Sequence, residues 1–459
     1  MTDPPAAIRL YAAHISVRAK SLVAAAVLAW APSLGAQPRD AGVISMGEPS
    51  WPDVHYGQPV PLDVPRPTDD LGRVASTRAP VTVHLGAEVS PALVDVALDA
   101  AARTLDYCER ALRLEGPWPD GLRGGDPGLD VYLLAHGVSD TPVDAMVTVA
   151  PWDRASAYVV AAAHEDPARV RRAVAEGVAR AVILGVKADH PPRVLWGLGR
   201  VIAERALDLP VDLDAVRAFQ SEPWRAVLGG PVAGEDEVTR ARGAGLFFTW
   251  LLARYDNARN TLLESVIRGS AGWTEGTAPR LVDEPDIIDH LRRLFRDEPL
   301  GLRGAFAQFC AQRALVGWNG DESASLPAPD LGARARELSW RALPVWVRPA
   351  SPTEPTGCQV VNLDLGDAPL DGDLTLWLHA VPWRRWLVRV LRVNAQGVAL
   401  PSLDTLPVRE GEWSMRLDGL REAKRVVIAV TDLGDETFEP DMPQSANGWF
   451  VLHVARDGR

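Results

Sequence analysis

The chain has 459 residues, of which 47% are hydrophobic and 24% charged, the balance of a folded soluble protein with several domains. Asp and Glu number 60 against 48 Lys and Arg, and the formal net charge of −12 argues against a nucleic-acid-binding surface. The three cysteines, Cys108, Cys310 and Cys358, are too few for a disulfide framework, and their spacing fits no zinc ribbon.

Residues 1–36 have the three-part pattern of a secretory signal peptide. Arg9, Arg18 and Lys20 precede an apolar run over 21–31, and small residues follow Pro32. The run is shorter than the roughly 20 residues that cross a bilayer. A buried core helix is the alternative. We therefore expect export to the periplasm or the extracellular space, with no transmembrane segment in the mature chain.

The next segments predict a lobe of mixed helices and strands. A Pro-rich lead-in covers 37–80, and an α+β lobe covers 81–207. Periodicity and Gly, Asp and Pro boundaries place strands at 81–85, 129–134 and 157–163, and helices at 92–112, about 166–186 and about 193–207. Asp166 and Pro167 mark the start of the second helix, as cap and first residue.

The rest of the chain changes from a helical period to a period of two. A helical lobe is expected over 208–340 and a linker over 341–357. The segment 358–459 predicts an antiparallel β-sandwich, with strands at 359–365, 374–380, 386–393, 413–417, 425–431 and 449–454. The predicted fold class is therefore α+β. Trp383, Trp386 and Trp413 suit the core of such a sandwich, with an exposed binding face as the alternative.

One stretch carries the functional argument. It comprises Asp130-Val131-Tyr132-Leu133, then Ala175-Glu176-Gly177-Val178-Ala179 on one helix, then Pro192-Arg193-Val194-Leu195-Trp196-Gly197-Leu198 opening the next. This order resembles the gluzincin zinc metallopeptidases, the group of thermolysin and aminopeptidase N. The likeness is closest to exported bacterial members that carry a C-terminal β-sandwich.

In that family the first helix carries H-E-x-x-H. Its two histidines share one helix face and bind zinc, and its glutamate is the general base for the metal-bound water. A glutamate of the second helix completes the site.

This chain departs from the family at every ligand. Ala175 and Ala179 stand where the histidines would be, Gly197 stands at the third ligand, and only the general-base position is kept, as Glu176. Alanine and glycine side chains cannot coordinate zinc, so the resemblance implies a peptidase-like fold without zinc or catalysis. Glu176, Trp196 and Arg200 would line the former cleft, and Glu176 would pair with Arg172 or Arg180. Two core helices of an unrelated scaffold are the alternative.

Three other features are open to two interpretations. His164-Glu165 precedes the Asp166 cap and reads as a turn, and the lone His190 reads as solvated rather than as a metal ligand. The acidic segment with Asp432, Asp435 and Asp441 is either a solvated loop or a calcium site.

The sequence therefore predicts an exported, non-catalytic pseudo-metallopeptidase that binds a peptide or an envelope protein. Two alternatives stay open. One is an active zinc peptidase with non-standard ligands, and the other is a purely structural or interaction protein of the cell envelope.

Overall fold

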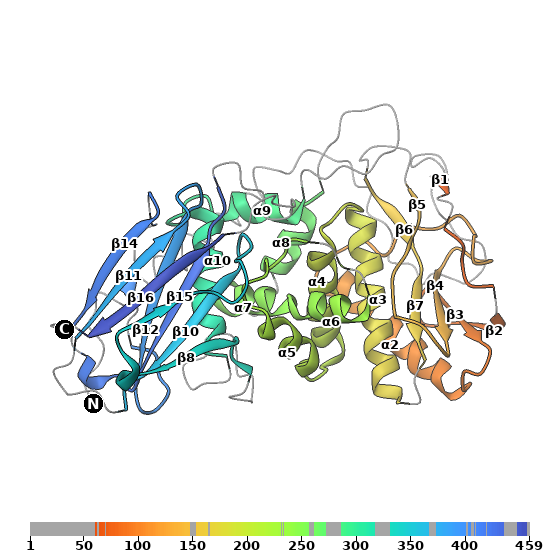
Figure 1. Cartoon of the computed structure of the whole chain (residues 1–459). Helices are drawn as coiled ribbons and strands as arrows, with labels where there is room; N and C mark the ends of the chain where they lie inside the picture. The colour runs from red at the N-terminus through yellow and green to blue at the C-terminus, as the bar shows by residue number, and fades with distance from the viewer. Residues whose placement is uncertain are drawn as a thin grey trace, which may run out of the picture. The chain divides into compact units, whose positions relative to one another are not determined.

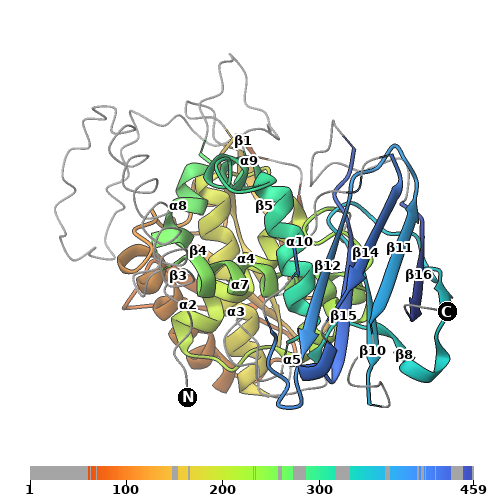
Figure 2. The ribbon, with the colours of Figure 1, turned by 90° about the vertical axis from the view of Figure 1, so that its left-hand side faces the viewer.

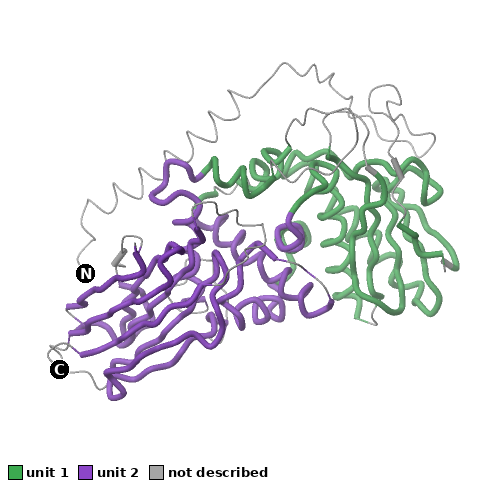
Figure 3. The backbone as a smooth tube through the Cα atoms, turned by 45° about the horizontal axis from the view of Figure 1, so that its top comes forward, with its two compact units in different colours: residues 1–190, 198–210, 255–294 green, residues 191–197, 211–254, 295–459 purple. Residues whose placement is uncertain are grey.

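The computed structural model describes most of the chain after the predicted signal peptide, which lies outside the described residues. The described residues are 60–61, 64–68, 70–146, 153–163, 166–230, 232, 234–256, 261–271, 286–316, 331–366, 373–400, 403–404, 408, 410–418, 420–435 and 448–456. They divide into two compact units, shown in Figure 3: unit 1 is 1–190, 198–210 and 255–294, and unit 2 is 191–197, 211–254 and 295–459.

Unit 1 is built on a four-stranded sheet in the order β2-β3-β4-β7 (Figure 1). Strands β3 (Val81–Gly86), β4 (Leu129–Leu134) and β7 (Val159–Ala162) run parallel, and β2 (Asp70–Ala75) is the antiparallel edge. Nearly every residue of β3 and β4 is buried, as expected of parallel strands covered on both faces. The predicted strands at 81–85 and 129–134 are confirmed.

A second, three-stranded antiparallel sheet in unit 1 was not predicted. It has the order β1-β5-β6, formed by β1 (Val60–Pro61), β5 (Val143–Met146) and β6 (Ala155–Ala157). Its strands have two to four residues each, too short to show a period of two. Strands β1 and β2 both lie within the predicted Pro-rich lead-in 37–80, so its described residues are part of the folded unit.

Helices α2 (Ala92–Arg110) and α3 (Pro167–Val186) pack on the four-stranded sheet and on each other. The predicted start of α3 is confirmed, since Asp166 accepts a hydrogen bond from the Ala168 amide at 2.9 Å and Pro167 is the first helical residue. The third predicted helix is α4 (Pro192–Leu207), of which residues 192–197 belong to unit 2 and the rest to unit 1. Helices α8 (Thr261–Gly269) and α9 (Ile287–Leu294) complete unit 1.

Unit 2 joins helices to a β-sandwich. Its helices are α5 (Leu213–Ser221), α6 (Glu235–Gly243), α7 (Gly245–Tyr255) and α10 (Gly301–Arg313). One sheet has the order β13-β12-β15-β10-β8 and the other β14-β11-β16-β9. Their bounds are β8 (Ala335–Ser339), β9 (Val345–Val347), β10 (Cys358–Asp364), β11 (Leu374–Ala380), β12 (Trp386–Val393), β13 (Leu403–Asp404), β14 (Glu412–Leu417), β15 (Arg425–Asp432) and β16 (Phe450–Arg456).

The six predicted sandwich strands are all present, and the α+β fold class is confirmed. The sandwich also takes in β8 and β9 from residues expected in the helical lobe and the linker, with β8 parallel to β10. Trp386 lies in the core between the sheets and Trp413 packs against it, whereas Trp383 is 62% exposed and is not a core residue. Figure 2 shows α10 lying along β12, on the outer face of the first sheet.

No helix among the described residues is both long and apolar enough to cross a membrane.

Candidate functional site

The helix pair that carries the family resemblance is packed as a core. Ala175 and Ala179 of α3 are fully buried, and Glu176 is buried beside them. On the sheet side of α3, a β-carbon placed on Gly177 would lie only 2.4 Å from Cγ1 of Val159 in β7. The glycine therefore lets the helix approach the strand more closely than any larger residue would allow.

The other side of α3 is covered by α4. A β-carbon on Gly199 would lie 2.8 Å from Cγ of Arg180 and 3.1 Å from the carbonyl oxygen of Glu176. The two helices are thus in direct contact at the turn that follows Glu176. Gly197, the third ligand position, lies in unit 2, where its β-carbon would lie 2.8 Å from the Gly245 amide nitrogen.

The charged residues around Glu176 are tied to neighbours. Arg172 bonds to Glu204 at 3.3 Å and to the Pro210 carbonyl at 2.5 Å. Arg180 donates from Nε to the Thr141 hydroxyl at 3.0 Å. Arg200 is fully buried with its Nε 3.7 Å from Glu204. The three residues expected to line a cleft are all buried. Glu176 and Arg200 are buried in unit 1, and Trp196 is buried in unit 2.

These residues do not fit the zinc ion of the gluzincins. Two methyl groups and a glycine hydrogen offer no lone pair to a metal. Among the described residues, no three or more His, Cys, Asp or Glu side chains are grouped so as to hold a metal ion. His164 and Glu165 lie outside the described residues. His190 is buried, so its solvated interpretation is wrong.

The residues expected as calcium ligands are only partly described, because Asp441 lies outside. Asp432 is fully buried, and its Oδ1 accepts a hydrogen bond from the Gly434 amide at 2.8 Å. The main-chain oxygen of Asp435 accepts one from Arg303 at 2.7 Å. Burial raises the pKa of Asp432 to about 7, against the opposing charge of Arg384. Asp432 therefore does not belong to a solvated loop, and its burial favours the protonated carboxyl.

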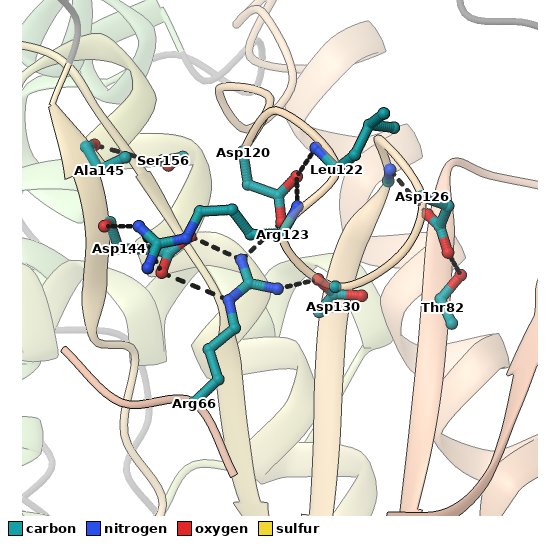
Figure 4. Close-up of polar contacts among 12 residues, drawn as sticks. Arg66, Thr82, Asp120, Leu122, Arg123, Asp126, Asp130, Asp144, Ala145 and Ser156 are labelled. Carbon is teal, nitrogen blue, oxygen red and sulfur yellow. Dashed lines mark hydrogen bonds and ion pairs between the residues drawn. The ribbon is translucent and has the colours of Figure 1, made fainter. Parts of the chain in front are cut away.

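Unit 1 holds a polar cluster that the sequence did not predict, drawn in Figure 4. The guanidinium of Arg66 lies among three carboxylates. It reaches Asp120 at 2.5 Å and Asp144 at 2.6 Å, and it makes a still closer contact with Asp130. The side chains of Asp130 and Asp144 are fully buried, and that of Arg66 is 10% exposed. A cation so enclosed by acids is strongly held, and the carboxylates raise the pKa of Arg66 although burial alone would lower it.

More polar contacts surround these acids. Arg123 lies 3.4 Å from Asp144 Oδ1, and His84 Nε2 lies 2.8 Å from Asp130 Oδ1. His84 also stacks on Tyr132, with 4.3 Å between ring centroids. Burial raises the pKa of Asp120, an effect that the charge of Arg66 opposes. Acidic side chains therefore predominate in the cluster, and Arg66 contributes much of the positive charge that offsets them.

The segment that brings Arg66 to this cluster lies as an extended peptide on unit 1. Val60 pairs with Met146 and Pro61 with Ala145, so β1 adds a strand beside β5. The Pro65 carbonyl accepts a hydrogen bond from the Tyr158 hydroxyl at 3.2 Å, and the Arg66 guanidinium lies 5.2 Å from the centroid of the same ring. One short strand thus holds residues 60–61, and one inserted side chain and one main-chain hydrogen bond hold residues 64–68.

Comparisons with known proteins assign no family to this chain. No family model and no curated protein matches it. Among solved structures, it is similar to Legionella pneumophila aminopeptidase A in complex with aspartic acid, at 12% identity and a TM-score of 0.36, over 74% of this chain and 34% of that one. It is also similar to a surface-associated copper-binding protein of Methylomicrobium album, at 9% identity and a TM-score of 0.19, over 27% of this chain and 97% of that one. The chain thus spans about a third of the length of the aminopeptidase.

Proposed function

We propose that this protein is an exported, non-catalytic pseudo-metallopeptidase that binds a peptide or an envelope protein. The non-catalytic part rests on side-chain chemistry. Ala175, Ala179 and Gly197 supply no donor atom, and Glu176 has no metal-bound water to activate. The close contact of α4 with α3 at Gly199 further supports it, because helix backbone fills the space beside Glu176.

The binding part rests on one observation, the way unit 1 holds residues 60–61 and 64–68. Strand addition supplies main-chain hydrogen bonds, and a pocket for one side chain supplies specificity, which together are a common mode of peptide recognition. Here the edge of β5 accepts the strand and the carboxylates Asp120, Asp130 and Asp144 accept the arginine. The ligand we propose is an extended peptide with an arginine, which would take the place of the chain's own segment.

The non-catalytic part is tested on purified protein by metal analysis together with a broad peptide-hydrolysis screen. We expect less than stoichiometric zinc and no turnover. Stoichiometric zinc, with hydrolysis that a chelator abolishes, would contradict the proposal.

The binding part is tested with the full chain carrying Arg66→Gln. This variant removes the Arg66 guanidinium from the carboxylates and leaves its place to the arginine of a peptide. A fluorescent peptide with the sequence of residues 58–68 is titrated by anisotropy, next to a matched peptide with glutamine in place of the arginine. Charge-assisted hydrogen bonds predict affinity about 10-fold or more higher for the arginine peptide. Equal affinity for both peptides, in a variant whose circular dichroism matches the wild type, would exclude the arginine pocket.

A further inference from the structure

Two of the three cysteines lie together in unit 2. Cys310 is in α10, and Cys358 is the first residue of β10. Both are fully buried, as members of one cluster of apolar side chains between α10 and the first sheet. Cys108 lies apart from them in α2 of unit 1, and all three thiols are free in the structure.

The two sulfur atoms make reciprocal contacts. Cys310 Sγ donates to the carbonyl oxygen of Thr356, two residues before Cys358, at 3.4 Å. Cys358 Sγ donates to the carbonyl oxygen of Cys310 itself at 3.9 Å. Each sulfur therefore lies against the backbone of the segment that carries the other.

The surroundings make the two thiols unequal. Burial acts to raise the pKa of Cys310, but the hydrogen bond with Cys358 and the positive charge of Arg313 lower it overall. Burial and Cys310 raise the pKa of Cys358 well above its usual value. Arg313 is fixed in place, because its guanidinium donates to Gln220 Oε1 at 2.7 Å and to the Phe219 carbonyl at 2.9 Å.

We propose that Cys310 and Cys358 are oxidised to an intramolecular disulfide that joins α10 to β10. The oxidant is a disulfide, either a small molecule such as oxidised glutathione or a disulfide-bearing oxidoreductase. The Cys310 thiolate attacks one sulfur of the oxidant, which releases one thiolate and leaves a mixed disulfide on Cys310. The Cys358 thiolate then attacks Cys310 Sγ and expels the second thiolate. Two protein thiols thus lose two electrons and two protons, and one oxidant disulfide becomes two thiols.

The burial of both sulfurs places this reaction in folding. An oxidant reaches the thiols before α10 is seated on the sheet, and packing of the apolar cluster then encloses the bond. The bond closes a long loop, residues 311–357, and so restricts the unfolded chain. Export would provide an oxidising compartment, but the proposal holds for any setting with a disulfide oxidant and is independent of peptide binding.

The test refolds the reduced full chain in a glutathione buffer, quenches it with acid, alkylates free thiols and maps the peptides by mass spectrometry. We expect one free thiol in the wild type, at Cys108, and a Cys310–Cys358 cross-linked peptide that has lost two hydrogen atoms. Cys108→Ala is the matched control and should keep the cross-link. Cys310→Ala with Cys358→Ala should lack it.

A second readout compares melting temperatures with and without dithiothreitol. Reduction should lower the melting temperature of the wild type and of Cys108→Ala by several degrees, and leave that of the double variant unchanged. If the double variant does not fold, the change in melting temperature on reduction of the wild type and of Cys108→Ala tests the proposal. Three free thiols in refolded wild type with native circular dichroism, or a cross-link that involves Cys108, would overturn the proposal.

Discussion

Arg66 is the residue that links the buried acids of the polar cluster in unit 1. Its guanidinium is the common partner of Asp120, Asp130 and Asp144. A buried ion pair adds little stability relative to apolar residues of the same shape, but removal of one partner leaves uncompensated charge in a low-dielectric interior. The cluster should therefore be much more sensitive to loss of the arginine than a surface ion pair.

We predict that Arg66→Ala lowers the free energy of unfolding by about 3–5 kcal/mol, the usual cost of leaving a buried charge unpaired. Arg78→Ala is a matched control, because the Arg78 side chain is 62% exposed and pairs with Asp99 at the surface. That control should change stability by about 1 kcal/mol or less. Urea denaturation of both variants measures the difference. Equal effects would mean that the carboxylates do not need Arg66.

Asp432 gives unit 2 a dependence on pH. Its pKa in the folded protein is about 7, raised by burial, whereas an unfolded aspartate ionises near 3.9. The folded state therefore holds this proton up to neutral pH and the unfolded state does not. The stabilisation is complete below about pH 4 and is lost as the pH rises toward 7.

We predict that Asp432→Asn abolishes the loss of stability as the pH rises toward 7. An amide keeps the Oδ1 acceptor for the Gly434 amide and carries no charge to bury. Relative to wild type, the variant should gain on the order of a few kcal/mol between pH 4 and pH 8. Asp418→Asn, at a side chain 70% exposed, is the control and should show no such gain. Denaturant titrations across this pH range measure it. A difference from wild type that does not change with pH would contradict the assignment.

At the scale of elements, glycines fix the distance between α3 and its neighbours. A glycine inside a helix usually costs about 1 kcal/mol relative to alanine, so the four glycines of α3 and α4 require a packing reason. Gly177 and Gly199 have such a reason, because a β-carbon on either would lie less than 3 Å from a neighbouring side-chain atom.

We predict that Gly177→Ala and Gly199→Ala each destabilise the protein by about 1–3 kcal/mol, the cost of overpacking, despite the better helix propensity of alanine. Gly72→Ala is the control, because a β-carbon there meets no atom within 4 Å. Thermal melts of the three variants compare them. A stabilised Gly177→Ala protein would show that α3 does not lie this close to Val159.

Sequence patterns located most of the long elements, and missed the short ones and the six-residue edge strand β2. Helix α3 and strands β4, β11 and β12 have a clear period or a long apolar run, and their bounds agree with prediction within a residue or two. Strands of two to five residues, such as β1 and β8, carry too few positions to show a period. Their pairing is set by partners distant in the chain.

The candidate site was predictable only in part, for the same reason. The residues at the ligand positions of the resembled motif, Ala175, Ala179 and Gly197, can be compared from the sequence because that motif is local. The Arg66 cluster is not, because Asp120, Asp130 and Asp144 come from separate segments that only the fold brings together. One signal was present: Asp130 is a carboxylate inside the apolar run Leu129–Leu134, and a buried carboxylate requires a cation or a hydrogen-bond donor.

At the scale of the whole molecule, we predict that stability does not depend on a transition metal. Since the described residues offer no ligand group, the melting temperature should be unchanged by a strong chelator or by added Zn²⁺. Differential scanning fluorimetry measures this directly. A melting temperature that falls on chelation and recovers with zinc would identify a metal site elsewhere in the chain.

The extended segment that carries Arg66 also sets where this protein can be shortened. Cutting the chain just before β2 would look harmless by sequence, since it removes only a proline-rich stretch. It would instead remove the strand that pairs with β5 and the one guanidinium that contacts all three of Asp120, Asp130 and Asp144. The first residue of a stable, minimal version should therefore lie upstream of Val60.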